Sequence, residues 1–253
     1  MKAIVKYILR NGARDRLYLG VFISLIVAFA VAIFLGSTML VEQQQTTMVF
    51  CAGSSRVILI VGMILFVCLT LNRAFENKEV EFILSKNISR QQFILAYLSG
   101  FYLSFIIILI PLLLAIFIVN KVDILGFIIW SVSILLEGLL VICFALLVSL
   151  ILKNSFSAIM SSFAFYLISR LMGVFVMAIE FPQSLNLTIR SILATILKLF
   201  SVLFPRLDLY GQSKWILYGF KDNTHLLMVI IQFIIYFGLL VFMAFHDFKK
   251  KQF

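Results

Sequence analysis

The sequence contains few charged residues: they make up 13% of it, whereas hydrophobic residues make up 63%. Soluble globular domains are about one quarter charged and about half apolar, so the composition excludes an ordinary soluble domain. The net charge of +10 does not indicate nucleic-acid binding, because most of the cations flank long apolar runs, where they orient a membrane protein. We therefore expect membrane lipid, and no nucleic acid, around this chain.

The sequence also lacks the patterns of metal and disulfide sites. Its three cysteines lie singly in or beside apolar runs, without the CxxC spacing of a metal site. His225 and His246 flank the last apolar run, about 30 Å apart along a helix, and cannot bind one metal or haem together. We expect no metal and no cofactor.

Catalytic motifs are missing as well. The sequence has no GxxxxGK[ST] phosphate loop, no HExxH and no GxSxG. An intramembrane enzyme would need paired carboxylates, a GxGD-like dyad or clustered histidines within the apolar runs, and none is present. We expect this chain not to be an enzyme, and nucleotide hydrolysis, if it drives the protein, must come from another chain.

Six apolar runs are long enough to cross a membrane as helices, since about 20 residues span the hydrocarbon core. They cover residues 17–41, 48–71, 93–119, 125–152, 157–179 and 226–245. The sequence therefore predicts an all-α, polytopic membrane protein with six transmembrane helices. These helices form a single domain over residues 1–253.

The first 16 residues predict a short amphipathic helix. Basic residues recur at every fourth position, and apolar residues occupy another face of the helix: Lys2, Lys6 and Arg10, against Ile4, Tyr7 and Ile8. Such a helix lies on a membrane surface. The alternative is a solvated basic end that only orients the first transmembrane helix.

The distribution of cations predicts the orientation. Most of the 21 lysines and arginines lie in the segments before the first, between the second and third, and after the last apolar run. Because cytoplasmic loops carry the excess of positive charge, both termini are expected in the cytoplasm, with the chain in the cell's inner membrane.

Residues 72–92 connect the second and third apolar runs and predict a short amphipathic helix with an acidic face. Glu76, Glu79 and Glu81 alternate with apolar residues in this segment. Ser89 and Gln92 then form a capping-box pattern that starts the next helix. The short helix suits docking to a cytoplasmic partner, although it could also lie on the lipid surface.

Three ionisable residues fall within apolar runs: Arg56, Glu137 and Arg170. Charged side chains in a membrane rarely face lipid, so we interpret these residues as part of a transport pathway or a dimer interface. Glu137 and Arg170 are expected on neighbouring helices and could form an ion pair. The alternatives are a purely structural pair and, for Arg56, a side chain that extends to the outer interface.

The long segment 180–225 is expected on the outer side. Its apolar stretch 187–204 resembles a seventh span, but polar residues recur along one face of it: Thr188, Ser191, Thr195 and Lys198. We therefore predict an interfacial or re-entrant helix, because a seventh crossing would also place the Lys-rich carboxyl end outside.

Two stretches carry a resemblance to a known family. EVEFILSKNISRQQFILAYLSG resembles the Glu-rich coupling segment, and LFPRLDLYGQSKWILYG the Pro-containing stretch before the last span, of the six-helix permease subunit of ABC-type exporters. The order of elements over nearly the whole chain is similar to the permeases of copper-enzyme maturation and bacteriocin-immunity systems. Asn87 stands where the family often has Pro, and Tyr97 where Lys is common.

The resemblance implies a permease that pairs with a second permease subunit, identical or related, and docks on a cytoplasmic ABC ATPase. It implies that the coupling element includes Glu76, Glu79, Glu81, Ser89 and Arg90. The expected function is outward transport of a hydrophobic or amphipathic substrate, because the spans offer no dense polar lining. The polar residues of segment 187–204 could lie at the outer end of the path. The alternative functions are a secondary transporter and a non-transporting membrane scaffold.

Overall fold

A computed structural model describes residues 2–40, 42–86, 88–119, 122–152, 154–180, 195–196, 204–220 and 223–250. Within these ranges all regular structure is helical, which confirms the predicted fold class. The elements are α1 (Lys2–Arg14), α2 (Leu17–Ser37), α3 (Gln43–Glu76), α4 (Glu79–Leu84), α5 (Arg90–Val119), α6 (Ile124–Ile151), α7 (Ser155–Glu180), η1 (Leu207–Leu209), α9 (Lys214–Tyr218) and α10 (Asn223–Lys250).

Six of these helices, α2, α3, α5, α6, α7 and α10, are long and apolar enough to cross a membrane, as predicted. Their ends differ from the apolar runs. Helix α3 begins at Gln43 rather than near residue 48, because the polar residues that precede the apolar run continue the same backbone hydrogen bonding. The predicted re-entrant helix at 187–204 lies almost wholly outside the described residues.

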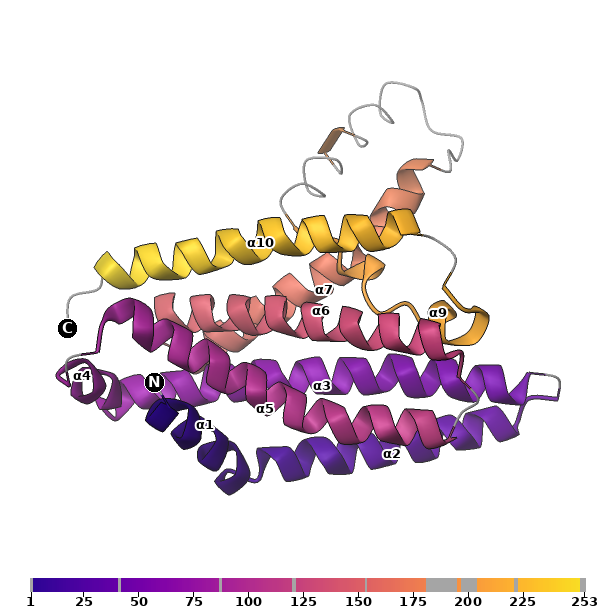
Figure 1. Ribbon diagram of the computed structural model, residues 1–253, viewed down its shortest axis with the longest axis horizontal. Coiled ribbons are helices and arrows are strands. Elements are labelled where there is room, and N and C mark those ends of the chain that lie inside the picture. Colours follow the sequence, from indigo (N-terminus) through magenta and orange to yellow (C-terminus); the bar gives the residue numbers. More distant parts are fainter. Residues whose placement is uncertain are drawn as a thin grey trace.

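The helices form an elongated bundle in which both ends of the chain lie together (Figure 1). Helices α1 and α4 and the end of α10 lie at one end, and the α2–α3 connection and α9 lie at the other. We call the first the basic end, because it carries exposed cations of all these elements: Lys2, Lys6, Arg10, Lys78, Lys86 and Lys249. This arrangement fits the even number of crossings that the sequence predicted.

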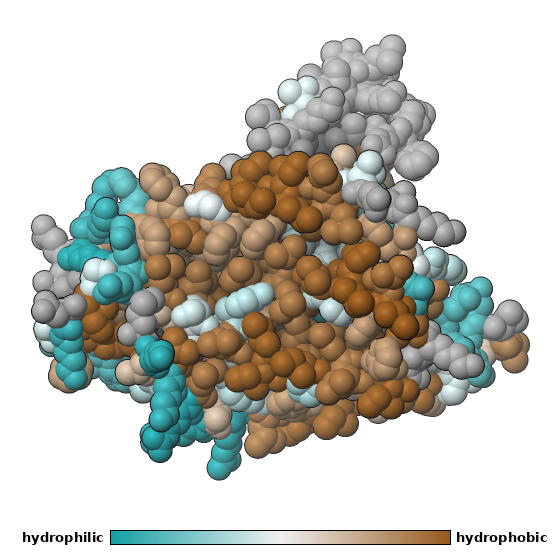
Figure 2. Space-filling model, in the orientation of Figure 1, coloured by the Kyte–Doolittle hydropathy of each residue, from teal (hydrophilic) through white to brown (hydrophobic). Residues whose placement is uncertain are grey.

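The core is built around α3 and α6, which are buried over most of their length, whereas α2 and α10 are mostly exposed. Helix α6 is apolar on all sides, as expected for a helix enclosed by others. The face of the molecule in Figure 2 is apolar too, and hydrophilic residues gather at its two ends. An apolar surface with polar ends is what a hydrocarbon layer requires of a protein that crosses it.

Helix α1 confirms the predicted amphipathic helix but packs on protein as well. Its apolar face is buried at Ile4 and Ile8, and Ile8 meets Gly100 of α5. A Cβ atom added to Gly100 would lie 2.6 Å from the Cδ1 atom of Ile8. Arg16, with φ of 54°, then turns the chain into α2. The amino-terminal helix is thus held on the bundle by a close helix approach.

We predict that Gly100→Val lowers the free energy of unfolding by about 1–3 kcal/mol, because the added methyl groups overlap Ile8. Thermal unfolding in detergent or nanodiscs measures this. Gly53→Val in α3 is the control, since no atom lies within 4 Å of the position of its added Cβ. Adding Ile8→Ala should recover part of the loss at Gly100, and equal losses at both glycines would contradict the packing described.

Candidate functional site

The two intramembrane arginines bind the same stretch of backbone. Residues 205–216, which we call the inserted segment, enter the bundle before α10, and Leu207 and Tyr210 are fully buried. The Nη1 atom of Arg56 donates to the carbonyls of Tyr210 and Gly211, at 2.9 and 2.6 Å. The Nη1 atom of Arg170 donates to the carbonyls of Leu207 and Tyr210. Helices α3 and α7 therefore hold one loop between them.

Helices α6 and α10 hold the same loop. The indole of Trp130 donates to the carbonyl of Gly211 at 3.1 Å, and the Gly211 N–H donates to the hydroxyl of Ser133 at 2.9 Å. The Tyr210 hydroxyl donates to the carbonyl of Val229 in α10 at 3.1 Å. Gly211 has φ of +52°, and a Cβ there would lie 2.7 Å from the Arg56 guanidinium, so this position requires glycine.

Glu137 lies against Arg56, not against Arg170 as expected from the sequence. The Arg56 Nε and Glu137 Oε2 atoms are 3.6 Å apart, and the two side chains are 4% and 0% exposed. Arg56 therefore does not extend to the membrane interface. The possible ion pair between Glu137 and Arg170 is thus not formed: Glu137 pairs with Arg56, and the Nη1 atom of Arg170 donates to the loop carbonyls, whose position no sequence pattern predicts.

Several buried polar atoms around this pair have no hydrogen-bond partner among the described residues. They are Arg56 Nε, both carboxylate oxygens of Glu137, Tyr166 Oη, Ser169 Oγ and Gln212 Oε1. Leaving such groups unpaired costs about 1–3 kcal/mol each, more for charged groups. We call Arg56, Glu137, Tyr166, Ser169 and Arg170 the polar centre. It offers donors and acceptors to polar groups that enter the middle of the bundle.

The predicted coupling segment lies at the basic end. Glu76 is the last residue of α3 and α4 begins at Glu79, because Lys78 adopts a left-handed φ of 55° that ends the first helix. The predicted short helix is thus only Glu79–Leu84. The capping box is confirmed: the Ser89 N–H donates to Gln92 Oε1 at 3.1 Å, and the Gln92 N–H donates to Ser89 Oγ at 3.2 Å.

A groove of about 330 Å³ separates α1 from α4 at the basic end. Its lining is mostly apolar: Ala3, Ile4, Tyr7, Glu79, Phe82, Ile83, Lys86 and Ile88. The Tyr7 hydroxyl donates to Glu79 Oε2 at 2.8 Å and ties the two helices together. Burial and the Glu79 carboxylate raise the pKa of Tyr7 to about 12. Phe82 is 62% exposed beside the groove, and the Lys86 ammonium lies 4.3 Å from its ring centre.

Arg90 has a structural partner that the sequence did not predict. Its Nη1 atom donates to the carbonyls of Phe248 and Lys249, both at 2.8 Å. The last carbonyls of a helix have no partner within the helix, so this guanidinium caps α10 and attaches it to the start of α5. Glu76 and Glu81 are exposed at the same end, as a docking role would require.

Of the proposed outer path residues, Thr188, Ser191 and Lys198 lie outside the described residues, and Thr195 is exposed. Sequence analysis missed the loop contacts of Trp130, Ser133 and Gly211. A glycine between polar residues in the inserted segment was the only local signal. In comparison with known proteins, no family model and no curated protein matches this chain.

We predict that Arg56→Met lowers the free energy of unfolding by about 3–5 kcal/mol, because it removes one of the two donors to each of the Tyr210 and Gly211 carbonyls and leaves Glu137 buried without a counter-ion. Denaturant titration measures the loss. The control is Arg206→Met, whose partly exposed pair with Asp208 contributes about 1 kcal/mol or less. Adding Glu137→Leu should restore only part of the stability, and full restoration would show that the loop carbonyls do not need Arg56.

We predict a pH dependence for the contact between α1 and α4. The Tyr7 phenol ionises at about 12 in the folded protein and near 10 when exposed, so its contribution is complete below pH 10 and is lost between pH 10 and 12. NMR titration of ¹³C-labelled tyrosine, assigned with Tyr7→Phe, measures this pKa. Glu79→Gln should lower it towards 10, whereas Glu81→Gln should leave it unchanged.

Proposed function

We propose that this chain is the membrane-spanning subunit of an ATP-driven exporter, with a separate ATPase docking at its basic end. The observation that carries the proposal is the position of α4. Helix α4 follows the carboxyl end of α3. Arg56 of the polar centre lies in the same unbroken helix α3, about 30 Å along the helix axis from Glu76. A force applied to α4 would therefore act on the contacts that hold the inserted segment.

Charge and connectivity support a cytoplasmic location for the basic end. Cations gather at this end, and the positive-inside rule predicts that such segments lie on the cytoplasmic side of the inner membrane. The groove between α1 and α4 and the exposed Phe82 give an ATPase both an apolar and a charged contact. Since the sequence has no phosphate loop, the energy of transport comes from this partner.

The spans support a hydrophobic or amphipathic substrate, because most of the buried side chains among the described residues are apolar, and the only charged ones are Arg56 and Glu137 of the polar centre. A pair of permease subunits, identical or related, would enclose the path. Helices α7 and α10 expose large apolar side chains, such as Leu167, Leu171, Ile234 and Phe242, which could contact a second subunit as well as lipid.

One observation favours a second function. Glu137 is fully buried and both of its carboxylate oxygens lack hydrogen-bond partners among the described residues. Intramembrane carboxyl groups of this kind serve proton-coupled secondary transporters. Export that persists without ATP, requires a proton gradient and is abolished by Glu137→Gln would support this second function over the first.

We predict that a tagged chain purified from its native membranes retains an ATP-hydrolysing protein, and that Glu76→Lys combined with Glu81→Lys reduces its recovery at least about tenfold. These two residues are chosen because they are exposed, whereas Glu79 and Arg90 hold α1 and α10. Glu42→Lys, exposed at the opposite end, is the control and should retain the ATPase.

Two results would contradict the proposal. One is equal ATPase recovery with both variants. The other is modification of a Glu81→Cys variant by a membrane-impermeant maleimide added outside intact cells, since α4 would then face the exterior. Labelling only after the cells are opened is the expected result.

A further inference from the structure

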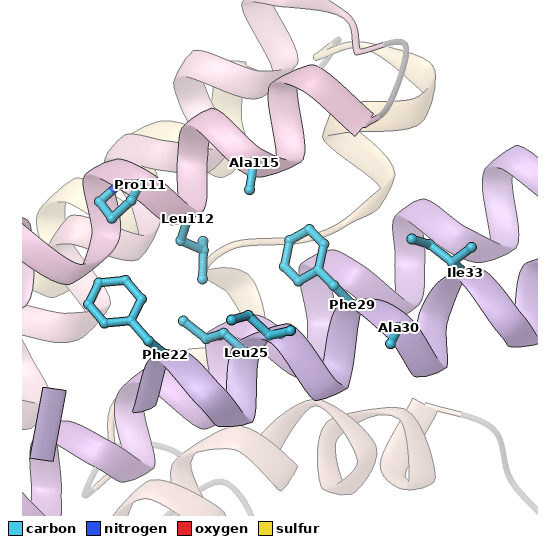
Figure 3. Close-up of a pocket in the computed structure, with 9 residues that line it drawn as sticks. Phe22, Leu25, Phe29, Ala30, Ile33, Pro111, Leu112 and Ala115 are labelled. Atoms are coloured by element: carbon cyan, nitrogen blue, oxygen red, sulfur yellow. The ribbon is translucent and has the colours of Figure 1, made fainter. Parts of the chain in front are cut away.

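A second groove, of about 430 Å³, lies between α2 and α5 on the apolar surface. Its lining is entirely apolar: Phe22, Leu25, Ile26, Phe29, Ala30, Ile33, Pro111, Leu112 and Ala115. Figure 3 shows Phe22, Leu25 and Phe29 of α2 reaching towards Pro111, Leu112 and Ala115 of α5 across an open space. Both helices are long and apolar enough to cross the membrane, so this groove opens into the hydrocarbon layer.

The shape of the groove follows from its residue types. Ala30 and Ala115 are too small to fill the space between the helices, and Phe22 and Phe29 form its walls. From Phe22 to Ile33 the groove extends about 16 Å along α2, at a rise of about 1.5 Å per residue. We call this groove the slot; its length along α2 and its volume of about 430 Å³ are of the size of one extended acyl chain.

The charges at its two ends select the headgroup. Three exposed arginines stand at the basic end of α2: Arg10, Arg14 and Arg16. Asp15 lies between them, but it pairs with Arg73 at 2.9 Å, so the cluster keeps its positive charge. Phe22 is only about 9 Å along the helix from Arg16. Beyond the other end of α2, the first charged residue along the chain is Glu42, which is exposed.

We propose that the groove binds one acyl chain of an anionic phospholipid whose phosphate lies against Arg14 and Arg16. The apolar slot contributes affinity for the acyl chain of the lipid, and the two arginines contribute selectivity for its anionic headgroup. Two other occupants are possible outcomes of the test. A zwitterionic lipid would fill the slot without a preference for an anionic headgroup, and a second copy of this chain would cover the same surface. The inference concerns the folded subunit alone and does not depend on the proposed transport function.

The first experiment fills the slot. The wild type, Ala30→Phe and Val27→Phe are reconstituted with equal amounts of phosphatidylglycerol and phosphatidylcholine, and the lipids retained after release into the gas phase are measured by native mass spectrometry. Val27 is 56% exposed on the same helix and does not line the groove, so it is the matched control. We expect Ala30→Phe to retain at least about fivefold less phosphatidylglycerol, and Val27→Phe to behave as wild type. Thermal unfolding of each variant shows whether it is folded.

The second experiment removes the charge. Arg14→Gln with Arg16→Gln should lower the preference for phosphatidylglycerol over phosphatidylcholine by about fivefold or more, while an acyl chain is still retained. Lys214→Gln, which removes an exposed cation at the opposite end, should not change the preference. Equal lipid retention by wild type and folded Ala30→Phe would overturn the proposal. So would efficient disulfide formation between copies that carry Phe29→Cys, because a second chain would then occupy the groove.

Discussion

The structure depends on hydrogen bonds that two arginines, the buried Arg56 and the partly buried Arg170, donate to the backbone of the inserted segment. A guanidinium has five N–H donors and cannot lose its proton, so it needs acceptors wherever it is buried. An irregular segment inside a membrane bundle has the opposite need, because carbonyls that do not take part in an α-helix have no bulk water to accept hydrogen bonds from. The Nη1 atoms of Arg56 and Arg170 donate to the carbonyls of Leu207, Tyr210 and Gly211, and the Nε atom of Arg56 lies 3.6 Å from Glu137 Oε2.

These hydrogen bonds fix the relative positions of four helices. Arg56 belongs to α3 and Arg170 to α7, while Trp130 of α6 and the backbone of α10 bind the same loop. Most other contacts between the described helices are apolar, whereas Arg90, Tyr7 and Arg73 make polar contacts at the basic end. The loop therefore provides the directional bonds that give this bundle one arrangement.

The features that could be predicted from the sequence are those that depend on residues close together along the chain. Hydropathy located the six spans, and the spacing of Ser89 and Gln92 located a helix start, because both are local. Prediction from the sequence failed where partners are distant along the chain. Arg90 caps a helix whose acceptors are 158 and 159 residues away, and Arg56 binds carbonyls 154 and 155 residues away. Backbone acceptors have no side-chain signature, so a possible pair of Glu137 with Arg170 on the neighbouring helix did not reveal that the loop carbonyls bind Arg170.

Besides the loop carbonyls, Arg56 has a second partner in the polar centre, the Glu137 carboxylate. This second partner affects how easily Arg56 can leave the loop. A buried guanidinium resists movement if it must leave its acceptors for an apolar environment. Here the Glu137 carboxylate lies 3.6 Å from Arg56 Nε, and both of its oxygens lack hydrogen-bond partners among the described residues. If α3 moved as a rigid helix under a force at α4, Arg56 could exchange the Tyr210 and Gly211 carbonyls for this carboxylate. The charge would stay paired throughout, so the barrier to releasing the inserted segment would be set by hydrogen-bond exchange and not by desolvation.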